Sequence, residues 1–349
     1  MSENLIYGAD ITAYGAVADG KTDCSDAFIK AIENGESLIV VPYGKYVLKK
    51  ALKLTSNLKI HLHANAEMIF DTKAKVCISA NDCSCLIISG GSFVCNNEGK
   101  TFLGLCECSN VKISDCTISS ANGLSLKNCE NVSMKNVGFD IDGNCVCIRG
   151  ENDDLRMKNI SAFSCVNVID IDEEASAENI TVDGVTLSDC KHLLGVYSGK
   201  LEGAKITEVG GDFSDSLILV SKDGSLCDVD VDEVFVYCSN ASGSKYFDLN
   251  GNIDGLEITS FKRSSDFEAR PFISTLVLKP KENSTAIIDG MLLDNVINAR
   301  ALSKTIKMTT ARLTNPTGKF VYTLECGIDA DDTLTIPLGD FDGLTIYTK

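Results

Sequence analysis

The sequence predicts an all-β fold, a single-stranded right-handed parallel β-helix with a short helix covering its N-terminal end. Short β-branched segments recur along the chain at steps of 21 to 27 residues, a period that indicates a stacked solenoid. A second set of apolar residues recurs in the same register. Few prolines and many Val, Ile, Asn, Ser and Gly residues favour three short strands per coil over the leucine framework of a leucine-rich repeat. The β-branched segments begin at Val111, Val132, Leu155, Ile180, Ala204, Val229 and Leu256.

Residues 1–50 are expected to form the N-terminal segment and cap. The stretch from Ser25 to Glu33 has the pattern of an amphipathic helix, with Asp23 or Ser25 as its N-cap and Gly35 at its end. A stack of coils has open ends that must be covered. We therefore expect the helix to close the first coil.

Residues 51–300 are expected to form the coils, and residues 301–349 a C-terminal cap or small β-module, because the periodicity fades near residue 300. In each coil a second strand shows two apolar residues at i, i+2 that are expected to point inward. The residues between and after them would face solvent, forming a strip along which a long ligand could lie. The expected inward pairs are Leu124/Leu126, Cys145/Cys147, Ile169/Ile171, Leu194/Val196, Leu217/Leu219 and Phe247/Leu249.

The chain is acidic, with 49 acidic and 32 basic residues and a formal net charge of −17. This charge argues against nucleic acid or an anionic membrane as the main partner. No apolar run approaches the roughly 18 residues of a membrane span. Because Met1 to Asp10 lack the basic start and apolar stretch of a signal peptide, we expect a protein that is cytoplasmic as made.

The 16 cysteines include several Cys-x-Cys pairs, a spacing that places both thiols on the same face of a strand. Zinc sites usually combine two cysteine pairs, or one pair with two histidines, and only His61, His63 and His192 are present. We expect reduced, buried thiols and no metal site, with disulfides or metal binding as the alternatives. The pairs are Cys83/Cys85, Cys106/Cys108 and Cys145/Cys147.

Two stretches near the N-terminus form a motif that is fairly specific for a fold. Residues 14–23 read YGAVADGKTD and residues 41–47, after the expected helix, read VPYGKYV. This arrangement, continued at residues 54–62 and 66–70, resembles the pectate-lyase-like superfamily, whose fold is also called pectin-lyase-like. The chain is most similar to glycoside hydrolase family 28, the polygalacturonases, and phage tailspikes have similar N-terminal segments. The resemblance implies a polysaccharide as partner but says little about the reaction.

The resemblance to polygalacturonases implies an inverting hydrolysis by aspartates on neighbouring coils. In such a reaction one carboxylic acid protonates the leaving oxygen and another carboxylate activates water. Here the matching positions hold Asn122, Gly143, Asn144 and Asn167, and no Arg-x-Lys pair appears around residues 193–199. Since asparagine does not exchange protons near neutral pH, the usual catalytic acids of that family are missing.

Asn122, Asn144 and Asn167 recur once per coil. They are expected either to stack as an asparagine ladder at a bend, where asparagine tolerates left-handed geometry, or to line a sugar-binding groove. The two roles are compatible.

Four other aspartates are the remaining candidates for catalysis. Asp140 and Asp142 precede the missing acids, and Asp170 and Asp172 fall on the outward strip. Carboxylates next to cations and an aromatic ring are typical of glycan sites, although a solvated acidic face is the alternative. The expected substrate-binding residues are Asn122, Asn144, Asn167, Lys127, Arg149, Tyr197 and His192.

Three functions follow from these residues. The first is a polygalacturonase-like glycoside hydrolase whose acid pair comes from Asp140, Asp142, Asp170 and Asp172. The second is a non-catalytic glycan-binding or phage tailspike-like protein, a homotrimer associated with the virion if it comes from a prophage. The third is a calcium-dependent polysaccharide lyase, in which the four aspartates would hold Ca²⁺. No other cofactor is expected.

Overall fold

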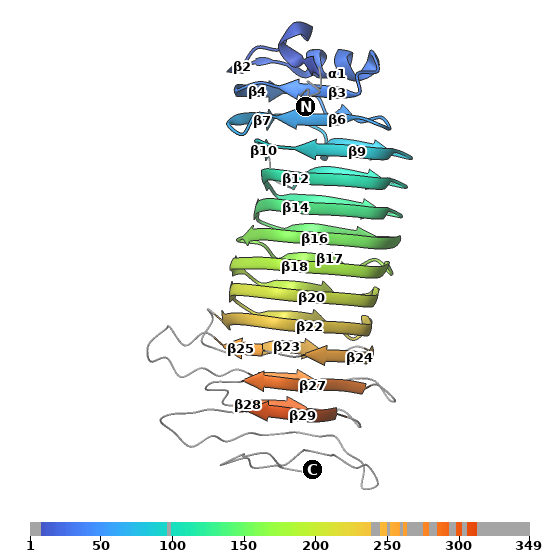
Figure 1. The fold of residues 1–349 in the computed structure, drawn as a ribbon, viewed down its shortest axis with the longest axis vertical. Helices are drawn as coiled ribbons and strands as arrows, with labels where there is room; N and C mark the ends of the chain where they lie inside the picture. Colours follow the sequence, from blue (N-terminus) through green and yellow to red (C-terminus); the bar gives the residue numbers. More distant parts are fainter. Residues whose placement is uncertain are drawn as a thin grey trace, which may run out of the picture.

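The computed structural model describes residues 8–95 and 99–238, with side chains as far as residue 236, and the backbone of seven further strands between residues 245 and 312. The chain winds as a right-handed parallel β-helix, with its coils stacked along one axis (Figure 1). The predicted fold class is confirmed. Residues 301–349, the expected C-terminal module, lie outside the described residues except for Ala301 and the strand Ile306–Arg312.

One strand from each coil joins an eleven-stranded parallel sheet, called sheet B here. The strands of sheet B are β5 (Leu52–Lys53), β8 (Val76–Asn81), β11 (Thr101–Cys106), β13 (Asn122–Lys127), β15 (Asn144–Arg149), β17 (Asn167–Ile171), β19 (His192–Val196), β21 (Ser216–Val220), β23 (Lys245–Leu249), β26 (Thr275–Leu278) and β28 (Asn298–Ala301).

The other strands form an eighteen-stranded parallel sheet, called sheet A. Its N-terminal strands are short: β1 (Ala9–Asp10), β2 (Asp19–Asp23), β3 (Leu38–Val41), β4 (Gly44–Leu48), β6 (Lys59–Leu62), β7 (Ala66–Phe70), β9 (Ser84–Ser89) and β10 (Ser92–Cys95). They are followed by β12 (Ser109–Ser120), β14 (Glu130–Ile141), β16 (Glu151–Phe163), β18 (Ser176–Cys190), β20 (Lys200–Phe213), β22 (Ser225–Cys238), β24 (Asn252–Ile258), β25 (Phe261–Arg263), β27 (Thr285–Leu292) and β29 (Ile306–Arg312).

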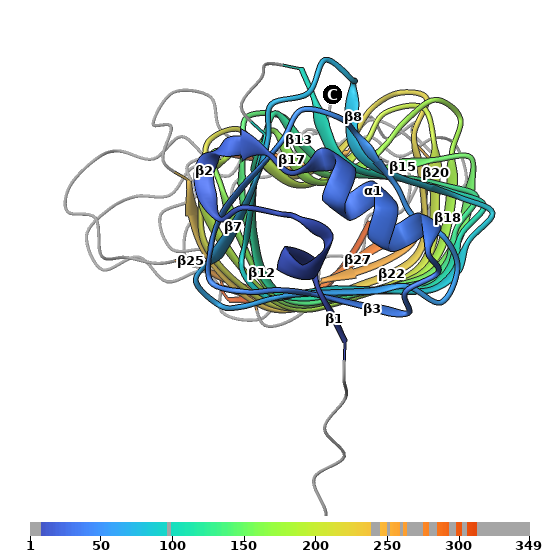
Figure 2. The ribbon, with the colours of Figure 1, turned by 90° about the horizontal axis from the view of Figure 1, so that it is seen from above.

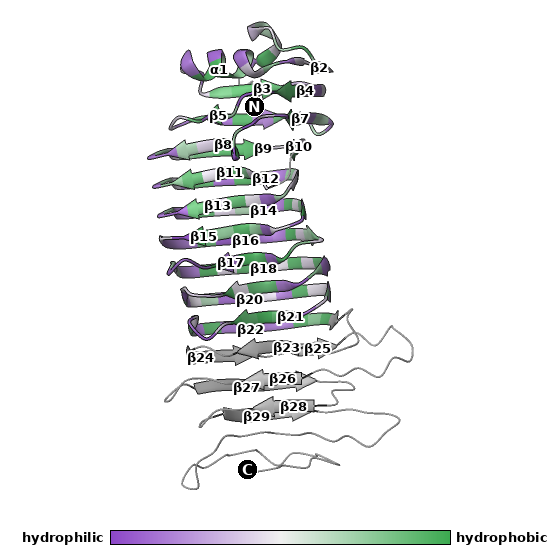
Figure 3. Cartoon of the chain, turned by 180° about the vertical axis from the view of Figure 1, so that it is seen from behind, coloured by the Kyte–Doolittle hydropathy of each residue, from purple (hydrophilic) through white to green (hydrophobic). Residues whose placement is uncertain are grey.

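The register of sheet A follows the repeat seen in the sequence. Val111 pairs with Val132, and Ala204 pairs with Val229, which pairs in turn with Leu256. Apolar and polar residues alternate along much of the long strands of sheet A (Figure 3), so that these strands bury about every second side chain in a core shared by neighbouring coils.

The long strands of sheet A bend where one residue takes the left-handed conformation. This residue is Asp115, Asn136, Asn159, Gly184, Glu208 or Glu233 on successive coils. The first three form a ladder, since Asn136 Nδ2 donates to Asp115 Oδ1 at 2.8 Å and Asn159 Nδ2 donates to Asn136 Oδ1 at 3.0 Å. Asparagine and aspartate suit this position because they tolerate positive φ.

The N-terminal end is closed by helix α1 (Ser25–Glu33), which lies across the first coils (Figure 2), preceded by the 3₁₀ helix η1 (Ile11–Tyr14). Phe28 of α1 is fully buried. The residue before the helix is Cys24, but Asp23 Oδ1 accepts the backbone N–H of Ser25 at 3.0 Å, and Gly35 follows the end with φ 77°. The predicted helix and its role as a cap are confirmed.

In two strands of sheet B, β15 and β21, the side chains that point inward are not the expected ones. Leu124 pairs with Val146, and Leu194 pairs with Ile218, so Val146 and Ile218 point inward. Cys147 and Leu219 face outward and are half-buried. In both strands several apolar residues follow one another, and either alternation fits such a run. The side chains of Phe247/Leu249 lie outside the described residues.

All fourteen cysteines whose side chains the structure describes are free thiols, as expected. The expectation that both thiols of a pair share one face is wrong for Cys83/Cys85 and Cys106/Cys108, and in the third pair Cys145 is buried whereas Cys147 is half-buried. Cys83 is buried whereas Cys85 is exposed, and Cys108 is buried whereas Cys106 is half-buried. A left-handed residue, Cys85 itself or Glu107 between the other two, interrupts the alternation.

Candidate functional site

Five of the expected site residues meet on the outward face of sheet B. Asn167 Nδ2 donates to Asn144 Oδ1 at 2.8 Å and to Asp170 Oδ1 at 3.3 Å. The Tyr197 hydroxyl donates to Asn167 Oδ1 at 3.3 Å. The Arg149 guanidinium binds Asp170 Oδ2 at 2.8 Å. Strands β15 and β17 and Tyr197, the residue after β19, thus place amide, carboxylate, guanidinium and phenol groups from three successive coils in one network.

Gly195 makes room for this network. It pairs with Asp170 in the middle of β19, and a Cβ atom there would lie 2.3 Å from Asn167 Oδ1 and 2.8 Å from the Tyr197 ring. A glycine inside a strand often marks such a close approach, which is the signal in the sequence that could have identified it.

The two aspartates on this face have different electrostatic environments. The side chain of Asp170 is 5% exposed, and burial raises its pKa although Arg149 acts in the opposite direction. Burial also acts to raise the pKa of Asp172, but the hydrogen bond from Ser198 Oγ at 2.7 Å helps to bring the net pKa below its usual range. Burial raises the pKa of the Tyr197 phenol as well.

His192 lies on the coil after Asn167, with which it pairs in register. Its Nδ1 is 2.7 Å from the Ser216 carbonyl oxygen and 2.9 Å from Ser216 Oγ, and its Nε2 is 3.7 Å from Asp215 Oδ2. The sequence interpretation missed Asp215 and Ser216. Their position 23 and 24 residues after His192, one coil further on, is the signal that could have identified them.

The other expected residues are more dispersed. Asn122 precedes Asn144 in the row and accepts its backbone N–H at 3.2 Å, and Lys127 is exposed beside Arg149. Asp140 is exposed in β14 of sheet A, and Asp142 is exposed in the turn after β14. Of the four candidate aspartates, only Asp170 and Asp172 therefore lie with the expected glycan-binding residues.

The asparagine ladder of sheet B exists, but its expected backbone geometry is wrong. Asn122, Asn144 and Asn167 are the first residues of extended strands, and none of them has positive φ. The ladder at the bend of sheet A is separate, and its asparagines, Asn136 and Asn159, do occupy left-handed positions.

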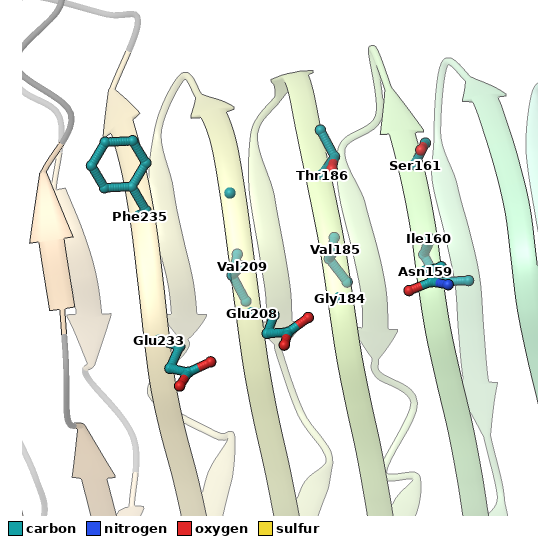
Figure 4. Close-up of a pocket in the computed structure, with 11 residues that line it drawn as sticks. Asn159, Ile160, Ser161, Gly184, Val185, Thr186, Glu208, Val209, Glu233 and Phe235 are labelled. Atoms are coloured by element: carbon teal, nitrogen blue, oxygen red, sulfur yellow. The ribbon is translucent and has the colours of Figure 1, made fainter.

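The bend of sheet A creates a second concave surface, the bend groove, which follows the axis of the solenoid. One section of about 880 Å³ extends from Ala64 to Ser161, and the next, of about 510 Å³, continues to Phe235 (Figure 4). The two sections share Asn159 and Ser161, so the groove continues from one to the other.

In the part of the chain that the structure describes, no three His, Cys, Asp or Glu side chains come together as a metal site. No described helix has the length and apolar character needed to cross a membrane.

A family model described as rhamnogalacturonase A/epimerase, pectate lyase-like, matches residues 9–192. A pre-neck appendage protein of Bacillus phage B103 is 43% identical over 51 residues, which are 15% of this chain and only 6% of that protein. These matches confirm the resemblance inferred from the N-terminal motif.

Two solved structures share the fold. The N-terminal fragment of bacteriophage phi29 gene product 12 superposes with a TM-score of 0.58 and 14% identity, over 93% of this chain and 68% of that one. A hyperthermoactive exopolygalacturonase from Thermotoga maritima gives a TM-score of 0.54 and 14% identity, over 91% and 92%.

Proposed function

Because the chain belongs to the rhamnogalacturonase A/epimerase, pectate lyase-like family, we propose that it binds an extended polysaccharide along the outward face of sheet B. The observation that carries the proposal is the network of Arg149, Asp170, Asn167 and Tyr197 on consecutive coils. A linear polymer running along the axis would meet equivalent positions at each strand spacing of about 4.8 Å.

Each group in the network has a use in binding sugar. Amide and carboxylate oxygens accept hydrogen bonds from hydroxyl groups, and the half-buried ring of Tyr197 offers an apolar surface to a sugar face. Lys127 and Arg149 are cations on neighbouring strands, which pair in register. They favour a glycan that carries carboxylate or sulfate groups, despite the negative net charge of the whole chain.

We propose further that this binding serves a phage appendage. The similarity to pre-neck appendage proteins and the fold shared with the phi29 fragment support virion association, with a surface polysaccharide as the partner. In this proposal the chain assembles as a homotrimer. Light scattering coupled to gel filtration would give three times the mass of one chain, and a monomer would contradict the trimer.

The binding proposal is tested on a panel of neutral and acidic polysaccharides. Tyr197→Ala removes the aromatic surface, and we expect affinity for the bound glycan to fall about tenfold, the loss of roughly 1.4 kcal/mol of contact energy. Tyr43→Ala is the matched control, because Tyr43 is an exposed tyrosine on the N-terminal coils. Equal losses in both variants, or no glycan bound by the wild type, would reject the proposal.

A second candidate function is hydrolysis of the bound glycan, supported by the opposite pKa shifts of Asp170 and Asp172. A carboxyl group of raised pKa suits the general acid, and one of lowered pKa suits the base that activates water. We expect Asp172→Asn to abolish the release of reducing ends while glycan binding is retained.

Release of reducing ends that continues unchanged in Asp172→Asn would rule out this assignment. Cleavage that stops when EDTA is added would instead favour the calcium-dependent lyase, which remains a prediction.

A further inference from the structure

The C-terminal section of the bend groove lies on sheet A, apart from the proposed polysaccharide site on sheet B. Its wall includes Glu208 on β20 and Glu233 on β22. Their neighbours pair in register, Thr207 with Asp232 and Val209 with Val234, so the two glutamates are opposite each other on adjacent strands. In Figure 4 both carboxylates project to the same side.

These two carboxylates lie close together without a bound cation. Neighbouring parallel strands are about 4.8 Å apart, and like charges directly opposite each other are unfavourable. The nearby Lys158 is bound to Asp183 and also attracts the Glu208 carboxylate, but no described residue forms a hydrogen bond or ion pair with the side chain of Glu208 or Glu233. A ligand that carries positive charge would relieve this repulsion.

The rest of the section offers groups of another kind. Phe235 is 52% exposed, and Gly210, its neighbour in register on β20, has no side chain that could cover the ring. On the other side Phe235 pairs with Lys262, whose side chain lies outside the described residues. Asn159, Ser161 and Thr186 add an amide and two hydroxyl groups along the same wall. Carboxylates for an ammonium group, an apolar ring for a sugar face and hydroxyls for sugar hydroxyls are therefore present together.

We propose that this section of the bend groove binds a linear oligosaccharide of amino sugars, with free ammonium groups at Glu208 and Glu233 and a sugar ring against Phe235. The groove runs along the axis and repeats at each strand, which suits a linear polymer. A basic peptide would satisfy the carboxylates but would leave the row of amide and hydroxyl groups without sugar hydroxyls to bind. The site is independent of the proposed function of sheet B.

The test measures binding of a β-1,4-linked glucosamine hexamer by calorimetry at low ionic strength, using the full chain. We expect the double variant Glu208→Gln/Glu233→Gln and the variant Phe235→Ala each to weaken binding about tenfold or more. The N-acetylated hexamer, which lacks the charge, should bind much more weakly to the wild type.

Matched controls separate the groove from the general attraction of an acidic protein for cations. Asp230→Asn removes an exposed acid from β22 outside the groove, and Phe163→Ala removes another exposed phenylalanine of sheet A, 51% exposed. Both should bind the hexamer as the wild type does.

A second double variant, Glu208→Asn/Glu233→Asn, guards against loss of folding, because asparagine tolerates the left-handed backbone at these positions better than glutamate does. It should melt no lower than the wild type and should still lose hexamer binding. Unchanged binding in either double variant, equal loss in Asp230→Asn, equal affinity for the N-acetylated hexamer, or equally tight binding of hexalysine would overturn the proposal.

Discussion

At the scale of single residues, the proposed site depends on one buried carboxylate. Asp170 accepts hydrogen bonds from Arg149 and Asn167, which lie on neighbouring coils. The sequence placed Arg149 near Asp170 because their strands lie one repeat apart, and it placed Asn167 in a row with Asn144 of the preceding coil. It did not predict Gly195 or the contacts of His192, since these depend on how closely two coils approach each other.

Asp170→Asn should destabilise the fold by about 1–3 kcal/mol, because Arg149 would lose its charged partner while remaining mostly buried, at 21% exposure. Urea unfolding would measure the difference. Glu173→Gln is the control, since Glu173 is the second partner of Arg149, at 3.4 Å, but is 74% exposed. The control should change stability by less than about 0.5 kcal/mol, and an equal effect in both variants would contradict the expectation.

At the scale of elements, the register between coils was predictable because equivalent residues of successive coils must all point into the shared core. Val111, Val132 and Leu155 begin equivalent segments, and they align as expected. Which side chains of β15 and β21 point inward was not predictable from alternation, because the runs of apolar residues in these strands fit either face of the sheet. The bend groove was missed because its wall combines residues that are separated by whole coils.

Two adjacent glycines of β20 test the packing of neighbouring strands. Gly211 has φ 103°, and a Cβ atom there would lie 1.9 Å from the Leu187 carbonyl oxygen, beside an irregularity in the pairing of β18 with β20. Gly211→Ala should therefore lower stability by about 3 kcal/mol or more. At Gly210 the nearest atom would be 3.7 Å away, so Gly210→Ala should be nearly neutral. Thermal melts of both variants make the comparison, and a similar loss in each would refute it.

The capping helix should respond to acid through Asp23. Burial acts to raise the pKa of this carboxyl, but hydrogen bonds from Ser25 and from the backbone of Lys49 hold its net pKa below the usual value of 3.8. Its contribution to stability is therefore complete above pH 3.8 and is lost as the pH falls through the lower folded value.

Melting temperatures measured across this acidic range should fall less steeply for Asp23→Asn than for the wild type. Parallel curves for Asp23→Asn and the wild type would show that this carboxyl has no such role.

At the scale of the whole molecule, the core is long, narrow and rich in reduced thiols. Ten of the fourteen cysteines whose side chains the structure describes are buried, three are half-buried and Cys85 is exposed. Folding therefore hides most of these thiols from reagents in water, although no disulfide restrains the described coils.

A thiol titration with a chromogenic disulfide reagent tests this arrangement. In urea without reductant, all 16 cysteines should react, whereas the native protein should show a rapid phase that Cys85→Ala lowers by one thiol. Fewer than 16 thiols in urea would reveal a disulfide. A rapid phase of unchanged size in Cys85→Ala would contradict the exposure of Cys85.

The strands of sheet B all point the same way, and the coils follow one another in a single order. The face they form consequently has no twofold symmetry, and its two ends are chemically different. A polysaccharide chain also has unlike ends, one reducing and one non-reducing. Only one orientation of a polysaccharide can match the order Asn144, Asp170, Tyr197 along the axis. The proposed site would therefore bind the polysaccharide with its reducing end toward one particular end of the solenoid.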